Sequence, residues 1–153
     1  MNTQSLDVTV PGNAHPQGSK RHVGGGRMIE ASPYVRAWRA TVAAHTLGAI
    51  GPAERRGQGT WPATGPCTLY VTFHFPRPKH HYKTGKFAGV LRAVAPQRMQ
   101  TGPDLDKLVR AIGDALTDAC AILDDRQIDV IYAAKKWADG DPYTSIHLQS
   151  DRP

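Results

Sequence analysis

The chain has 153 residues, enough for one domain with a hydrophobic core. Hydrophobic residues make up 40% and charged residues 21% of it, which excludes a disordered or fibrous protein. Its two cysteines are too few for a disulfide framework or a four-thiolate zinc site. The first residues lack the basic and apolar regions of a secretion signal, and no apolar run approaches the roughly 18 residues of a membrane span. We therefore expect a soluble, cytoplasmic protein without membrane association.

The formal net charge of +6 is unevenly distributed along the chain. Residues 1–100 hold 13 of the 19 lysines and arginines and only three acids, whereas residues 101–153 hold six basic residues and ten aspartates. No acid occurs from Arg55 to Pro103. A basic field attracts a polyanion, and a cluster of aspartates repels one unless cations intervene. The distribution predicts a nucleic acid held near bound metal ions.

The first half of the chain predicts a strand, a basic loop and a helix. Residues 6–10 alternate between apolar and polar, which is typical of a strand. The glycine-rich segment 18–27 lacks the spacing of a P-loop, and its three adjacent glycines favour a hairpin tip or mobile loop over a phosphate cradle. Ser32 before Pro33 predicts a helix start, and Gly51-Pro52 predicts the end of that helix and a loop up to residue 65.

Residues 67–75 form the clearest predicted strand, and a long segment without periodicity follows it. The strand alternates so that one face is buried. Residues 77–103 carry six cations and no acid, with His80, His81 and Tyr82 among them. A connection this long is usually functional or disordered. Its composition favours a flexible loop that contacts nucleic acid, and a solvated insertion is the alternative.

The last third predicts a helix over 104–121 and a hairpin of strands 128–137 and 143–148, joined by a turn at Asp139-Gly140. The element order β-α-β-α-β-β predicts an α+β fold. We expect a single domain over residues 1–153, in which two main helices pack on a mostly antiparallel or mixed sheet of about four strands.

Two pairs of aspartates frame the predicted helix. Asp104 and Asp106 lie at its start, and Asp124 and Asp125 follow its end. On a regular helix, side chains two positions apart point about 160° away from each other, so Asp104 must be extended if both carboxylates are to face one ion. Asp124 joins them only if the next strand begins beside the helix start. Such carboxylates suit Mg²⁺, and two ions would activate water and neutralise a departing oxyanion. The structural alternative is an ordinary N-cap and an ordinary turn.

Other charged residues allow two interpretations each. Arg110 follows Asp106 by one turn and either pairs with it or reaches a phosphate. Asp114 and Asp118 are expected to be solvated charges, with a helix-orienting acceptor as the alternative for Asp114. The segment Lys135-Lys136-Trp137 either contacts the DNA backbone and stacks a base or protects a sheet edge. A histidine-based zinc site is weaker, because the seven histidines include only one close pair.

Segments 103–116 and 123–128 resemble the signature of the RusA family of Holliday-junction resolvases, which are carried mainly by bacteriophages and prophages. The shared features are an Asp-x-Asp pair, a basic residue four positions later, an Asp-Ala-Leu triplet, and a later Asp-Asp-x-Gln. A looser resemblance covers residues 18–22 and Trp38-Arg39.

This resemblance implies a homodimeric crossover-junction endodeoxyribonuclease of the bacterial cytoplasm, acting in recombination and repair. It would use Mg²⁺, with Mn²⁺ as a substitute, and would make paired nicks across a four-way junction. By position, Asp104, Asp106 and Asp124 would be the catalytic, metal-binding residues. Arg110 would be the catalytic basic residue, which is usually a lysine in the family. The expected DNA contacts are Lys20, Arg21, Arg77, Lys79, Lys83, Lys86, Lys135 and Lys136.

Two alternative functions stay open at this point. A non-catalytic basic DNA-binding protein would bind junctions in a salt-sensitive manner that is indifferent to Mg²⁺. A general Mg²⁺-dependent nuclease would cleave linear duplex as well as junctions.

Overall fold

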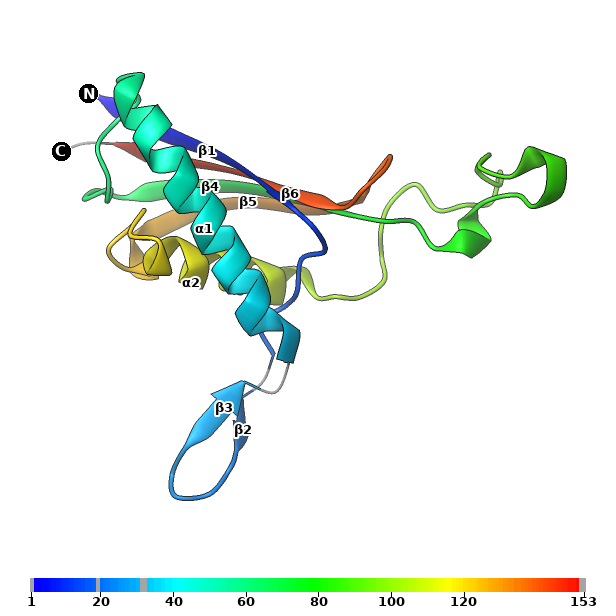
Figure 1. The fold of residues 1–153 in the computed structure, drawn as a ribbon, viewed down its shortest axis with the longest axis horizontal. Helices are drawn as coiled ribbons and strands as arrows, with labels where there is room; N and C mark the ends of the chain where they lie inside the picture. Colours follow the sequence, from blue (N-terminus) through cyan, green and yellow to red (C-terminus); the bar gives the residue numbers. More distant parts are fainter. Residues whose placement is uncertain (1, 19, 31–32, 152–153) are drawn as a thin grey trace.

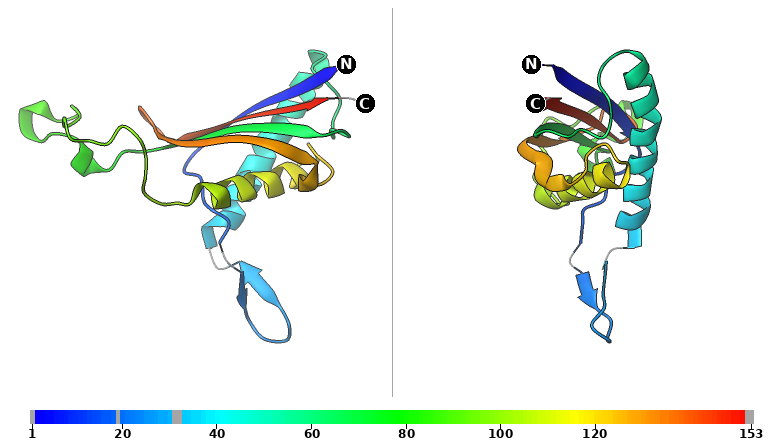
Figure 2. Two further views of the ribbon diagram at one scale, coloured as in Figure 1. Left: turned by 180° about the vertical axis from the view of Figure 1, so that it is seen from behind. Right: turned by 90° about the vertical axis from the view of Figure 1, so that its left-hand side faces the viewer.

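Alternation of buried and exposed residues builds the central sheet of the protein, which is described by a computed structural model over residues 2–18, 20–30 and 33–151. Two helices cover one face of this four-stranded mixed sheet, which confirms the predicted α+β fold (Figures 1 and 2). The elements in chain order are β1 (Thr3–Pro11), β2 (Lys20–His22), β3 (Met28–Glu30), α1 (Pro33–Arg55), β4 (Cys67–Phe75), α2 (Leu105–Asp118), β5 (Ile128–Trp137) and β6 (Tyr143–Asp151).

The order of strands in the sheet is β1-β6-β4-β5. Strand β6 is antiparallel to both β1 and β4, and β5 is parallel to β4. The predicted hairpin of residues 128–137 and 143–148 is therefore wrong, because β4 lies between these two strands. Strand β6 buries every second residue from Thr144 to Ser150, which suits an interior position, whereas the largely exposed β5 suits an edge.

Helix α1 continues through Gly51 and Pro52 to Arg55, so the predicted stop at Gly51-Pro52 is wrong. Proline removes one hydrogen bond, to the carbonyl of Gly48, and that residue is exposed to water. Buried Ala53 packs in the core, and the chain turns away after the helix at Gly57, whose φ is +71°. There the N–H groups of Gly57 and Gln58 donate to the carbonyls of Glu54 and Ala53, respectively. The Ser32 N-cap prediction falls outside the described residues.

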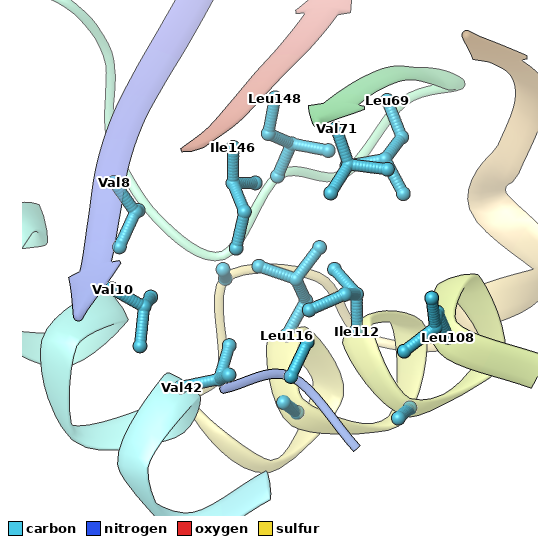
Figure 3. Close-up of a cluster of buried hydrophobic side chains, with 14 of the residues drawn as sticks. Val8, Val10, Val42, Leu69, Val71, Leu108, Ile112, Leu116, Ile146 and Leu148 are labelled. Carbon is cyan, nitrogen blue, oxygen red and sulfur yellow. The ribbon is translucent and has the colours of Figure 1, made fainter. Parts of the chain in front are cut away.

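Helix α2 has nearly the predicted extent, and its apolar face packs under the sheet. Leu108, Ile112 and Leu116 are fully buried, and they face Leu69, Val71, Ile146 and Leu148 of the strands and Val42 of α1 (Figure 3).

The two helices are also joined by an ion-pair cluster. The Arg39 guanidinium lies 3.0 Å from the carboxylate of Asp118 and 3.8 Å from that of Asp114. The prediction of solvated charges holds in part, since the two side chains stay 29% and 49% exposed while both pair with Arg39. The hydrogen bond from Arg39 that joins the helices, at 3.0 Å, is accepted by Asp118.

Two segments lie outside the sheet. Strands β2 and β3 form a hairpin whose tip is Gly24, Gly25 and Gly26, all with positive φ, as the glycine pattern predicts. Residues 77–103, here called the basic arm, extend beyond one end of the sheet (Figure 1). The arm contains 3₁₀ turns at Lys79–His81 and Gly85–Phe87 and a bridge between Tyr82 and Leu91.

The packing of α2 predicts the effect of shortening one of its core side chains. Leu116→Ala should lower the free energy of unfolding by about 2–5 kcal/mol, because Leu116 is 0% exposed and its loss leaves a cavity. Leu47→Ala on α1 is the matched control, since Leu47 is 57% exposed, and it should stay within about 0.5 kcal/mol of the parent. Urea unfolding measures both, and equal values for the two variants would contradict this packing.

Candidate active site at the start of α2

Asp104 occupies the N-cap position of α2 with an extended backbone, at φ −68° and ψ 131°, as required for its carboxylate to face the side of Asp106. Its side chain does not cap the helix. The carboxylate Oδ2 instead lies 3.1 Å from Nζ of Lys107, and both groups are substantially exposed to water. An exposed ion pair of this kind contributes little stability, so the Asp104 carboxylate is available to a ligand.

Asp106 and Arg110 lie one turn apart on the exposed side of α2. Neither makes a hydrogen bond or an ion pair with any residue that the structure describes, so the alternative of a salt bridge between them is not observed. Asp106 stands in the first helical turn, at the positive end of the helix dipole. The pair therefore presents a free anion and a free cation side by side.

Lys135 of β5 fixes the chain immediately before these residues. Its ammonium donates to the backbone carbonyl of Thr101 and, at 2.9 Å, to that of Pro103. Lys135 is a predicted DNA contact, but two of its three N–H donors serve this internal connection. It is therefore a residue that positions the start of α2 against the sheet.

Asp124 is occupied by its own turn. It caps the 3₁₀ turn Asp125–Gln127 by accepting a hydrogen bond from the Arg126 backbone N–H at 2.9 Å. The Arg126 guanidinium also donates to both carboxylate oxygens, at 2.8 and 3.1 Å. These hydrogen bonds and the charge of Arg126 lower the pKa of Asp124 to about 2. Gln127 completes a capping box by accepting from the Asp124 backbone N–H.

Asp125, in contrast, lies against α2. A Cβ atom added to Gly113 would be 3.6 Å from the Cβ of Asp125. Because Asp106, Arg110 and Gly113 follow the i, i+4, i+7 pattern, they share one side of the helix, and Asp125 lies at the far end of that stripe. Asp125 is exposed and forms no ion pair with any described residue. The spacing Asp-x-x-Gln from Asp124 to Gln127 is the sequence signal that marks Asp124 as a cap and leaves Asp125 for another role.

The acids do not form a closed cluster within the chain. In residues 2–18, 20–30 and 33–151, no group of three or more histidine, cysteine, aspartate or glutamate side chains is placed to hold a metal ion. Asp125 lies beside Gly113, and Gly113 is about 10 Å along the helix axis from Asp106. The link after α2 therefore does not bring the Asp124-Asp125 pair to the helix start.

The basic arm divides its cations between structural and exposed positions. Nη1 of Arg77 donates to the carbonyl of Pro96 at 2.8 Å, and the guanidinium lies over the Trp137 ring at 5.4 Å. The ammonium groups of Lys83 and Lys86 lie 5.6 and 5.2 Å from the centre of the exposed Phe87 ring. Lys79 is exposed in the first 3₁₀ turn.

His81 is one of the close histidine pair. Its ring packs perpendicular to the Trp137 ring, with the ring centres 5.1 Å apart. Burial, together with the nearby His80 and Arg77, lowers the pKa of His81. Among the described residues no third ligand joins the two histidines, so a packing role describes His81 better than zinc binding.

The remaining predicted DNA contacts differ in how far they are described. Lys136 is exposed at the end of β5 and makes no hydrogen bond or ion pair with another described residue. The side chains of Lys20 and Arg21 lie outside the described part of the chain. None of the helices in the described ranges is long and apolar enough to cross a bilayer.

Comparison with models of protein families gives a match to the family described as Endodeoxyribonuclease RusA over residues 11–149. The matched range includes both helices, the whole basic arm and every aspartate discussed above. A search among curated proteins gives no match.

The pairing of Asp124 with Arg126 predicts an altered titration when the guanidinium is removed. In Arg126→Ala, the pKa of Asp124 should rise from about 2 toward its ordinary 3.8 without reaching it, because the backbone N–H at residue 126 still donates. In the parent protein, the stabilisation from the pair is complete above pH 3.8 and is lost as the pH falls through about 2. Carboxyl ¹³C NMR follows this titration. Arg56→Ala is the control. An unchanged Asp124 titration in Arg126→Ala would show that Arg126 does not pair with Asp124.

Proposed function

The chain belongs to the family of RusA endodeoxyribonucleases, and on that premise we propose that it resolves four-way DNA junctions in recombination and repair by paired, metal-dependent phosphodiester hydrolysis. The family assignment implies an endonuclease of Holliday junctions, and the metal dependence and the pairing of the two nicks are the proposal. One observation supports the proposal most strongly. Asp104, which is exposed, and Asp106, which has no ion-pair partner among the described residues, lie at the start of α2, where the acid-free basic arm ends.

The donor set fits a hard divalent cation. Asp104, Asp106 and Asp125 offer carboxylate oxygens, which Mg²⁺ prefers and Mn²⁺ also accepts. Mg²⁺ keeps several waters and is usually bound through one or two carboxylates together with substrate phosphates, so the two acids at the helix start suffice once DNA is bound. A bound ion supplies an activated water and neutralises charge on the phosphate. We assign the third acid to Asp125, since the Asp124 carboxylate is held by Arg126.

Arg110 would hold a phosphate oxygen next to these acids. Its guanidinium is exposed and has no partner among the described residues, and an arginine can bind a phosphate through two parallel N–H donors. Arginine stays protonated at all ordinary pH values, so a role as proton donor to the leaving group is poorly suited to it. We therefore assign Arg110 to positioning the phosphate and stabilising its charge.

We also propose that the working form is a homodimer. A four-way junction presents two strands related by a two-fold axis, and a two-fold dimer presents two sites with the same symmetry. Such a dimer would make both nicks within one complex. It would also offer a way to complete the set of carboxylates, which a single chain leaves open over the described residues.

A synthetic four-way junction with a linear duplex of the same sequence as competitor tests the function. We expect symmetric nicks in two opposite strands of the junction in Mg²⁺, none in EDTA, and little cleavage of the duplex. Equal cleavage of the duplex would make the protein a general nuclease, and Mg²⁺-indifferent binding without cleavage would make it a DNA-binding protein.

The choice between the neighbouring aspartates predicts opposite outcomes for two isosteric variants. Asp125→Asn should lower the rate of junction cleavage by about two orders of magnitude, because a group that supports bound metal is lost. Asp124→Asn should cleave nearly normally, because asparagine also caps a turn. Asp151→Asn, at the end of β6 and outside the proposed donor set, controls for the loss of one negative charge. Loss of cleavage in Asp124→Asn alone would reverse the assignment.

The exposed lysines of the arm predict a change in the salt dependence of junction binding. Replacing Lys83 and Lys86 by glutamine should reduce the slope of log K against log salt by about 0.9 for each phosphate that the variant no longer neutralises. Arg55→Gln at the end of α1 removes one positive charge elsewhere and should leave the slope unchanged. Fluorescence anisotropy between 50 and 200 mM salt, roughly the range in which such interactions are resolved, measures it. An unchanged slope in the double variant would exclude these lysines as phosphate ligands.

A further inference from the structure

A cavity of about 520 Å³ lies where the base of the arm meets the end of β5 and the start of α2. Leu105, which separates Asp104 from Asp106, forms part of its wall. Arm residues 97–99 and strand residues 133–137 form much of the remainder. The cavity therefore adjoins the candidate catalytic acids without containing them, and the family assignment gives it no role.

The charged groups of the cavity favour an anion. Four cations and one acid line it. Arg77 and Lys135 are engaged with backbone carbonyls, as described above. Arg98 and Lys136, in contrast, are exposed and make no hydrogen bond or ion pair with any described residue. Two free cations beside one carboxylate, that of Asp139, suit a phosphate group.

The apolar groups of the cavity favour a flat ring. Trp137, Met99 and Leu91 line it together with two alanines of β5. The indole of Trp137 is held in place by the Arg77 guanidinium over its ring and by the ring of His81, so it is a rigid surface. Nucleobases stack on aromatic rings and guanidinium planes and pack against apolar side chains.

We propose that this cavity takes one unpaired nucleotide of the branched DNA, next to the cleaved phosphate. The base lies against Trp137 and Met99, and its phosphate contacts Arg98 and Lys136. The volume lies within the roughly 300–1,000 Å³ of sites for small organic ligands. This inference rests on the proposed function and adds to it a source of selectivity for junctions. A base in a continuous duplex must be unstacked and unpaired to enter the cavity, and this costs less free energy for a base at the branch point.

Scanning the junction with abasic nucleotides tests the cavity. One nucleotide at a time near the branch point is replaced by an abasic residue, and binding is measured in EDTA so that cleavage does not contribute. Leu91→Trp fills the cavity without changing charge, at a residue that is 43% exposed and tolerant of a larger side chain. Val94→Trp is the matched control, because Val94 lies on the same arm, is 87% exposed and does not line the cavity.

We expect one abasic position to weaken binding of the parent protein roughly tenfold, the effect of losing one stacked base. Leu91→Trp should weaken binding of the intact junction by a similar factor and should no longer respond to that abasic position, whereas Val94→Trp should respond as the parent does. As a second variant, Arg98→Gln should bind the intact and the abasic junction more weakly by one common factor.

Selective junction binding with no abasic position of reduced affinity would overturn the nucleotide site while leaving the proposed function intact. The same holds if Leu91→Trp and Val94→Trp respond alike. Absence of any preference for the junction over linear duplex would instead overturn the proposed function, and the nucleotide site with it.

Discussion

The hydrogen bonds from the Lys135 ammonium to the backbone carbonyls of Thr101 and Pro103 are the interaction on which the candidate site depends. They join the end of the basic arm to strand β5 immediately before Asp104. The parallel pairing of β4 and β5 also places the start of α2 at this end of the sheet, because a helix that connects two parallel strands begins at their carboxyl ends. The arm, the start of α2 and the nucleotide-sized cavity consequently meet at one end of the sheet.

Ion pairs within residues 101–153 leave only some of the aspartates available to bind a ligand. Arg39 neutralises Asp114 and Asp118 between the helices, and Arg126 holds Asp124 in its turn. Asp106 and Asp125 keep no ion pair among the described residues. The formal net charge of +6 thus combines a basic arm that suits a polyanion with a few uncompensated carboxylates, whose negative charge a bound cation would neutralise.

Local patterns in the sequence predicted most of the helices and strands. The order of the strands and the contacts within the site depend on residues that are far apart in the sequence. The strand Cys67–Phe75 was predicted to the residue because its alternation reports a single buried face. The stop at Pro52 failed because its cost depends on whether the carbonyl four residues earlier is exposed. The hairpin of β5 and β6 failed because no local signal shows that β4 lies between them. Within the site, the Asp-x-x-Gln capping spacing is present in the sequence, but the prediction from the sequence was Asp124 and did not use it. The connection made by Lys135 joins residues 32 positions apart, and no local pattern reports it.

We propose that the acids at the start of α2 perform chemistry on DNA that other residues bind. Asp106→Asn separates these two roles most directly, because Asp106 has no described partner whose loss would disturb the fold. Junction binding in EDTA and junction cleavage in Mg²⁺ are measured on the same preparation. We expect the variant to bind the junction at least as tightly as the parent and to cleave it about two orders of magnitude more slowly, or slower still. Cleavage at the parental rate would contradict this proposal.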